Sequence, residues 1–168
     1  MNLVSAETQL RSYFAEYEPG MARLGKALRA KLRRRLPGLF EIVYLYVGRN
    51  ALVISYSPTG QGYGGVCSLS VDPHQAKLYF ARGSQLSKAD PNRLLQGRAG
   101  VRYVVMNEAA EFDRPEIEAL IAAALKLAKV RLDAGAKGSV IIRAESQKKR
   151  ASRAGRPAPA RRTEKART

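Results

Sequence analysis

The sequence is poor in the residues that build disulfides and zinc sites. It has one cysteine, Cys67, and one histidine, His74, in 168 residues. A single cysteine excludes an internal disulfide, and chains of this kind usually belong to a reducing compartment. Structural zinc sites take four ligands, mostly Cys and His, so a zinc site of the usual kind is not expected either.

Long apolar runs are also missing. No stretch approaches the roughly 18 consecutive apolar residues that a membrane helix needs. The first ten residues include Glu7 and lack both the basic start and the apolar centre of a secretory signal. We therefore predict a cytoplasmic protein without a membrane span.

What the chain does have is positive charge, with 30 Lys and Arg against 14 Asp and Glu and a net charge of +16. Residues 146–168 hold nine of the bases and one acid, while residues 1–145 hold 21 bases and 13 acids. The final segment has no hydrophobic residue larger than alanine, so burial cannot offset the entropy lost on ordering. We predict one domain over residues 1–145 and a basic disordered tail over residues 146–168.

Polyanions such as nucleic acid are the expected partners of this tail, because its charge is almost all positive. Residues 153–157 (RAGRP) resemble an AT-hook, whose core is an Arg-Gly-Arg-Pro run, with an alanine inserted after the first arginine. A generic basic arm explains the same residues. The candidate polyanion-binding residues of the tail are Lys148, Lys149, Arg150, Arg153 and Arg156.

Apolar residues at helical spacing predict helices over residues 3–17 and 21–36. The second helix is strongly basic toward its C-terminal end, where cations complement the helix dipole. A third helix is predicted to start with Asp113 as its N-cap, Pro115 in its first turn and Glu116 completing a capping box. The candidate polyanion-binding residues of the second helix are Arg29, Arg33, Arg34 and Arg35.

Runs of β-branched and aromatic residues predict strands over 40–47, 51–56, 66–71, 76–81, 101–106 and 140–143. The short turns between the first four strands imply antiparallel pairing. The glycine-rich residues 58–65 are expected to be a mobile connection that can act as a lid over one end of the sheet. A short helical turn is expected from Asp90-Pro91 to Gly97. This order predicts an α+β two-layer sandwich, with an antiparallel sheet of five to six strands packed on the N- and C-terminal helices.

Several short sequence motifs resemble those of one branch of the YdhG-like family of unknown function. They are residues 29–37, LYFARGSQL at 78–86, Asp90-Pro91, LLQG at 94–97, Val101-Arg102-Tyr103 and Asp113-Arg114-Pro115. The resemblance covers about residues 20–130 and implies a frataxin-like α+β sandwich. It also makes iron handling a candidate function, because a bacterial member has been described as a frataxin-like iron chaperone.

Iron delivery calls for a ridge of hard oxygen ligands, whereas the first helices here are basic. The acids that cluster near the third helix are better explained by the dipole at the start of a helix. They are Glu108, Glu111, Asp113, Glu116 and Glu118.

Tyrosines recur on the predicted strands, and alternation sends some of them to the face away from the helices. One interpretation is a partly exposed surface with ordinary cross-strand pairs. The other is a concave aromatic face that binds an apolar ligand or stacks on bases. We favour a groove for a small ligand or a partner over base stacking, because the strand motif of sheet-based RNA binders is missing. The basic residues that flank the long loop form either an anion site or solvated charges and salt-bridge partners of Asp90 and Glu108, and they are Arg82, Lys88, Arg93, Arg98 and Arg102. The candidate ligand-binding residues are Tyr44, Tyr46, Tyr79, Arg82, Arg98 and Arg102.

No short stretch brings together an acid, a base and a nucleophile, so we predict that the chain is not an enzyme and needs no cofactor. The favoured hypothesis is a non-catalytic binding domain that holds a small ligand or a protein partner on the sheet and the long loop, with a tail that contacts polyanions. One alternative is a nucleic-acid-associated protein that uses the basic helix and the tail. Another is a frataxin-like iron chaperone.

Overall fold

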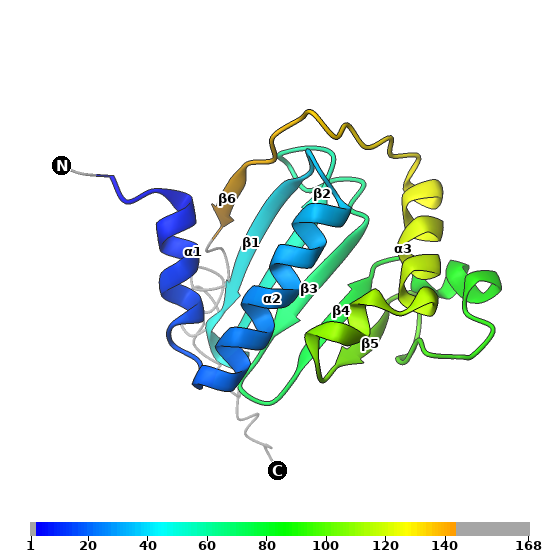
Figure 1. Ribbon diagram of the computed structural model, residues 1–168, viewed down its shortest axis with the longest axis horizontal. Helices are drawn as coiled ribbons and strands as arrows, with labels where there is room; N and C mark the ends of the chain where they lie inside the picture. Colours follow the sequence, from blue (N-terminus) through cyan, green and yellow to red (C-terminus); the bar gives the residue numbers. More distant parts are fainter. Residues whose placement is uncertain (1–2, 144–168) are drawn as a thin grey trace, which may run out of the picture.

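The computed structural model describes residues 3–143 and shows an α+β fold in which helices pack against a six-stranded sheet (Figure 1). The predicted two-layer α+β class is therefore confirmed. The predicted tail, with Lys148, Lys149, Arg150, Arg153 and Arg156, lies outside the described residues. The helices are α1 (Ala6–Phe14), α2 (Pro19–Arg35) and α3 (Pro115–Ala128), and the strands are β1 (Phe40–Tyr46), β2 (Ala51–Ser57), β3 (Cys67–Val71), β4 (Ala76–Phe80), β5 (Arg102–Met106) and β6 (Val140–Arg143).

The strands lie in the order β5-β4-β3-β2-β1-β6. Strands β1 to β5 form the predicted antiparallel meander, in which each strand pairs with the next along the chain. Strand β6 instead joins the sheet parallel to β1, so the sheet is mixed. The long return of the chain through α3 and residues 129–139 makes this possible, because a parallel neighbour needs a long crossover.

The three α-helices lie on the same side of the sheet, and the main hydrophobic core fills the space between the two layers (Figure 1). The longest of them, α2, has 17 residues. None of the helices within residues 3–143 combines the length and the apolar character needed to cross a membrane. The helices contribute Leu10, Phe14, Leu28, Leu32, Ile117, Leu120 and Ile121 to the core, and the strands contribute Val43, Ile54, Leu69 and Leu78.

Helix α2 approaches both α1 and the sheet closely at Gly25. A Cβ atom at this position would lie 2.7 Å from Cε1 of Phe14 and 3.2 Å from Cγ2 of Val71. Both neighbours are fully packed in the core. Glycine therefore lets the two helices meet over β3, although it is a poor helix former.

The start of α3 differs from the prediction. Its N-cap is Arg114, which makes no capping hydrogen bond with its side chain, and Pro115 is the first helical residue. Asp113 is instead the last residue of the short 3-10 helix η3 (Ala109–Asp113) and pairs with Lys31. The capping box lies at the start of η3 and is formed by Glu108 and Glu111.

The long loop between β4 and β5 is also built differently from the prediction. Its helical part, η2 (Gly83–Ala89), comes before Asp90 rather than after it. The Asp90 carboxylate accepts hydrogen bonds from the backbone N–H groups of Leu94 and Leu95, at 2.8 and 2.9 Å. Gln96 then pairs with Tyr103 of β5 as an isolated bridge. The loop therefore folds back on β5 at one edge of the sheet.

Candidate ligand-binding groove on the open sheet face

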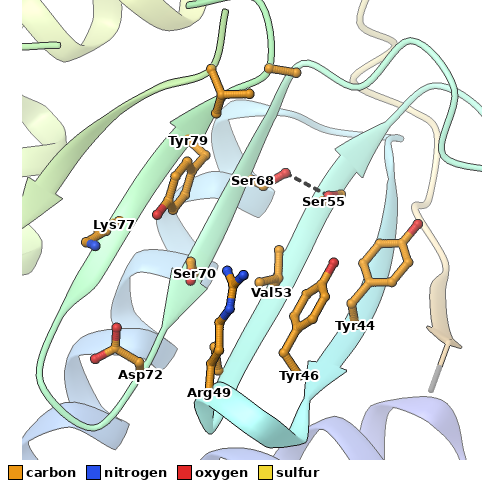
Figure 2. Close-up of a pocket in the computed structure, with 13 residues that line it drawn as sticks. Tyr44, Tyr46, Arg49, Val53, Ser55, Ser68, Ser70, Asp72, Lys77 and Tyr79 are labelled. Carbon is orange, nitrogen blue, oxygen red and sulfur yellow. Dashed lines mark hydrogen bonds between the residues drawn. The ribbon is translucent and has the colours of Figure 1, made fainter. Parts of the chain in front are cut away.

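The sheet face opposite the α-helices carries a groove of about 450 Å³ (Figure 2). Strands β1 to β4 supply most of its lining. The register explains this, because Val53 of β2 lies opposite Tyr44 of β1 and Ser70 of β3. Ser70 in turn lies opposite Lys77 of β4. Side chains opposite each other in neighbouring strands point to the same face, so these four residues share the groove.

Tyrosines stand on both sides of the groove. On β1, the rings of Tyr44 and Tyr46 stack with their centroids 6.3 Å apart. On the other side, the rings of Tyr79 and Tyr103 lie 5.2 Å apart and are tilted by 44°. The strands between them carry small side chains that leave room above the sheet, namely Ala51, Val53, Ser55, Ser68 and Ser70. Strands β1 and β4 are three strand spacings apart, so this floor is about 14 Å wide.

The charged residues of the groove are mainly positive. Arg49 rises from the turn between β1 and β2, and its guanidinium lies over the floor near Ser70 and Val53 (Figure 2). The Nζ atom of Lys77 lies 4.7 Å from the centre of the Tyr103 ring. The only acid of the lining is Asp72, whose Oδ1 accepts hydrogen bonds from the backbone of His74 and Gln75. The lining therefore carries two cations against one carboxylate.

The glycine-rich residues 58–65 close the open face beside Tyr44. Arg143 donates hydrogen bonds to the carbonyl groups of Gly60 and Gln61, at 2.8 and 3.0 Å. A Cβ atom at Gly60 would lie 3.2 Å from Cδ1 of Ile141 and one at Gly62 would lie 3.3 Å from the Tyr44 hydroxyl. The segment thus lies over one end of the sheet beside Tyr44, and its action as a lid stays a prediction.

The structure brings together three of the six predicted ligand-binding residues. Tyr44, Tyr46 and Tyr79 line the groove, but Arg82, Arg98 and Arg102 do not. Arg102 lies opposite Phe80, which is in the core, and a Cβ atom at Gly83 would collide with its side chain. Arg82 donates a hydrogen bond to the carbonyl group of Leu127 at the end of α3. Arg98 is exposed in the long loop. The structure therefore does not bring the arginines of the long loop into the tyrosine groove, and an anion site formed by these arginines themselves stays a prediction.

Arg49 and Lys77 are the basic residues that line the groove, and the sequence analysis named neither as a candidate. For Lys77 a signal was available, because it lies two residues before Tyr79 on the same strand and alternation sends both to one face. Arg49 is in η1 (Val47–Arg49), which replaces the predicted simple turn. Its direction depends on the turn geometry, for which the sequence has no clear signal.

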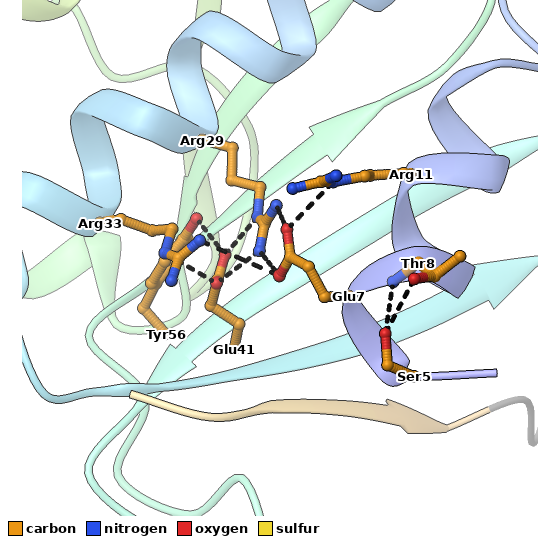
Figure 3. A network of polar contacts seen from close by, with 8 residues as sticks. All are labelled: Ser5, Glu7, Thr8, Arg11, Arg29, Arg33, Glu41 and Tyr56. Atoms are coloured by element: carbon orange, nitrogen blue, oxygen red, sulfur yellow. Dashed lines mark hydrogen bonds and ion pairs between the residues drawn. The ribbon is translucent and has the colours of Figure 1, made fainter. Parts of the chain in front are cut away.

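The basic helix has a largely structural role in the part of the chain that the structure describes. Arg29 is only 9% exposed and lies between two carboxylates (Figure 3). It donates to Glu41 at 2.8 and 2.9 Å and to Glu7 at 2.7 Å through each terminal nitrogen. Burial alone would lower the pKa of Arg29, but these hydrogen bonds and the two charges raise it. The hydrogen bonds from Arg29 likewise lower the pKa of Glu7.

Three further cations of α2 have acidic partners. Nε of Arg33 lies 3.4 Å from Glu41. Arg35 forms a bidentate pair with Glu118 of α3, with a shortest distance of 2.7 Å, and Lys31 pairs with Asp113. Within residues 3–143, Arg34 is exposed and joins no ion pair. The charges of Arg29 and Arg35 thus tie α2 to α1, β1 and α3, and polyanion binding by this helix stays a prediction.

The described residues also include one cysteine and one histidine, which do not lie close together. Burial raises the pKa of the Cys67 thiol to about 12, so it stays protonated. His74 follows the opposite end of β3, too far from Cys67 for a catalytic pair. No group of three or more His, Cys, Asp or Glu side chains within residues 3–143 could hold a metal ion. The clustered acids near α3 are engaged instead, as Glu111 shows by accepting the backbone N–H of Asn107 at 2.7 Å.

Comparison with known proteins does not identify a relative of this chain. No protein-family model, curated protein or solved structure matches the chain. The resemblance to the YdhG-like family therefore stays a prediction based on short sequence motifs. The groove has to be interpreted from its own residues.

Proposed function

We propose that this chain is a non-catalytic binding protein that holds a small ligand in the groove on the open sheet face. The observation that carries this proposal is a concave surface with tyrosines on both sides and small polar residues between them. Its volume of about 450 Å³ is that of a small-molecule site, which is typically mostly apolar with a few polar groups. This favours a small ligand over a protein partner, and the groove over the long loop.

The hydroxyl groups of the groove support a binding role rather than a catalytic one. A serine nucleophile needs a base within hydrogen-bond reach, and the base needs an orienting group. Ser55 and Ser68 instead hydrogen-bond to each other, with 2.7 Å between their Oγ atoms. The one carboxylate of the lining, Asp72, caps a turn with its Oδ1.

Thermal unfolding of the wild type and of a groove-filling variant, Ser70→Trp, tests the proposal. A ligand that binds only the folded state raises the melting temperature, so a panel of metabolites should contain members that stabilise the wild type. The indole of the variant occupies the floor, and these members should not stabilise it. Because the chain has no tryptophan, the indole also reports by its fluorescence that the variant is folded. A panel without effect, or with equal effect on both proteins, would contradict the proposal.

A nucleic-acid-associated role remains the second candidate, supported by the net charge of +16 and by the exposed Arg34. It is tested with labelled DNA and RNA, full-length protein, a variant ending at residue 145, and Arg34→Glu. Binding that survives truncation, weakens with Arg34→Glu and falls steeply with salt would support it. Binding that is lost with the tail alone would reduce the nucleic-acid contact to a generic basic anchor.

A further inference from the structure

We infer that the ligand of the groove is a flat aromatic ring that carries one anionic group. This inference rests on the proposed function and names the chemical class of its ligand. The ring packs against Tyr44 and Tyr46 above the small side chains of β2. The anionic group, a carboxylate or a phosphate, meets Arg49 and Lys77.

The place of the ring follows from the tyrosine side of the groove. Tyr46 keeps 40% of its surface exposed, although large aromatic side chains are normally covered when they can be. Its ring stands beside the floor of Val53 and Ser55, where Figure 2 shows open space above short side chains. Aromatic rings pair best in offset or edge-on arrangements at 4.5–7 Å, as Tyr44 and Tyr46 already do. A flat ligand ring extends this stack across the floor.

The place of the anion follows from the charges. The Arg49 guanidinium lies over the floor and forms no ion pair with any acid of residues 3–143. On the helix side, every arginine of the Glu7–Glu41 network forms an ion pair with one of these carboxylates. The guanidinium of Arg49 differs from them because it forms no such pair. A guanidinium presents a fork of donors that matches carboxylate and phosphate. Lys77, on the strand beyond Ser70, adds a second positive charge.

The same features argue against larger occupants. The segment that includes Gly62 lies against the Tyr44 hydroxyl, so it stands in the way of a long polymer that would follow the tyrosines in this direction. The basic tail of this chain, residues 146–168, has a net charge of +8 and is repelled by Arg49 and Lys77. Charge complementarity therefore selects a small anion.

Three matched probes separate the ring from the charge. They are 2-naphthoate, which has both features, 2-naphthamide, which has the ring alone, and cyclohexanecarboxylate, which has the charge alone. Each is titrated into full-length protein labelled with nitrogen-15, and amide chemical shifts report both the site and the affinity. We expect 2-naphthoate to bind about five- to tenfold more tightly than either control, because charge-assisted hydrogen bonds add to stacking. The largest shifts should fall on Tyr46, Val53, Ser70 and Lys77.

Two substitutions complete the experiment. Arg49→Gln should lower the affinity for 2-naphthoate toward that for 2-naphthamide, with Lys77 supplying the remaining attraction, and should leave the affinity for 2-naphthamide unchanged. Arg34→Gln, which removes an exposed arginine from the helix layer, is the matched control and should change neither affinity.

Equal binding of 2-naphthoate and 2-naphthamide in the groove would overturn the aromatic-anion class and leave the proposed binding function standing. Shifts confined to the helix layer, or the absence of shifts, would also overturn the class. The proposed function would then depend on the metabolite panel with Ser70→Trp, which does not assume an aromatic anion.

Discussion

The two faces of the sheet use the same strands for different purposes. Along β3, Leu69 points into the core and is 1% exposed, whereas its neighbours Ser68 and Ser70 line the groove. Along β4, Leu78 is buried while Lys77 and Tyr79 line the groove. Alternation with a period of two residues thus lets one strand stabilise the fold with one set of side chains and form a binding surface with the other.

The charges of the two faces differ in the same way. On the helix side, Arg29 is buried between Glu7 and Glu41, and Glu41 also accepts a hydrogen bond from Tyr56. Within residues 3–143, Arg49 on the open face joins no ion pair. A buried charge must be paired to be tolerated, while a cation bordering a groove can stay in water until a ligand arrives. The comparison therefore separates groups that hold the fold together from groups that can bind.

The largest loss of stability is expected for Arg29→Met. The substitution leaves the Glu41 charge buried and without its main partner, which typically costs about 3–5 kcal/mol of unfolding free energy. Urea denaturation measures it. The double variant Arg29→Met with Glu41→Leu removes both charges and should regain most of the loss. If the single variant is as stable as the wild type, Arg29 does not have the structural role described for it.

Adjacent substitutions on β3 test the two faces directly. Leu69→Ala opens a cavity in the core and should cost about 2–5 kcal/mol. Ser70→Ala, one residue further on, faces the groove and should change the unfolding free energy by less than about 0.5 kcal/mol. Urea denaturation of both variants is the measurement. Similar losses in the two variants would show that the open face is as structural as the covered one.

A smaller effect is expected from the acid side of the Arg29 network. The pKa of Glu7 is lowered from 4.5 in the folded state, so its ion pair stabilises the fold above about pH 4.5. This stability is lost as the pH falls below 4.5 through the folded-state pKa. Between about pH 5 and pH 3, the wild type should therefore lose more unfolding free energy than Glu7→Gln. Equal losses in the two proteins would show that the ion pair of Glu7 does not stabilise the fold.

The smallest effect is expected where α2 meets α3 at the surface. Arg35 and Glu118 form a bidentate pair, but Glu118 is exposed. Arg35→Gln should therefore cost no more than about 1 kcal/mol, because water screens such pairs. Arg34→Gln, at the unpaired neighbouring position, is the control and should cost nothing measurable. A loss of unfolding free energy above about 2 kcal/mol for Arg35→Gln would show that this pair behaves like the buried ion pairs of Arg29 instead.

The sequence predicts most of the fold because hydrophobic periodicity reports which residues can be buried. The helices, the meander and the tyrosines of the groove follow from it, as Tyr44 and Tyr46 show with their two-residue spacing. The parallel pairing of β6 could not be predicted, because pairing direction depends on where the chain returns after α3. Asp113 is a suitable cap by residue type, yet η3 ends at that residue and its carboxylate pairs with Lys31.

The charged residues were predicted less well than the tyrosines. The reason is the same for the arginines of α2 and for those around the long loop. Charge patterns show how many cations a segment has but not which acids meet them in space. Glu7 and Glu41 are 22 and 12 residues from Arg29 in sequence, and only the packing of α1 and β1 against α2 brings them together. Arg102 is a ligand-binding candidate of the sequence together with the tyrosines, but its register opposite Phe80 places it on the other face of the sheet.

The most direct test of the account removes the binding groups of the open face together. A triple variant with Tyr46→Ser, Arg49→Gln and Lys77→Gln is compared with the wild type by urea denaturation, without any ligand. If this face serves binding and the helix face serves stability, the unfolding free energy should stay within about 1.5 kcal/mol of the wild type. A loss of more than about 3 kcal/mol, comparable to that of a core substitution, would contradict the division between the two faces.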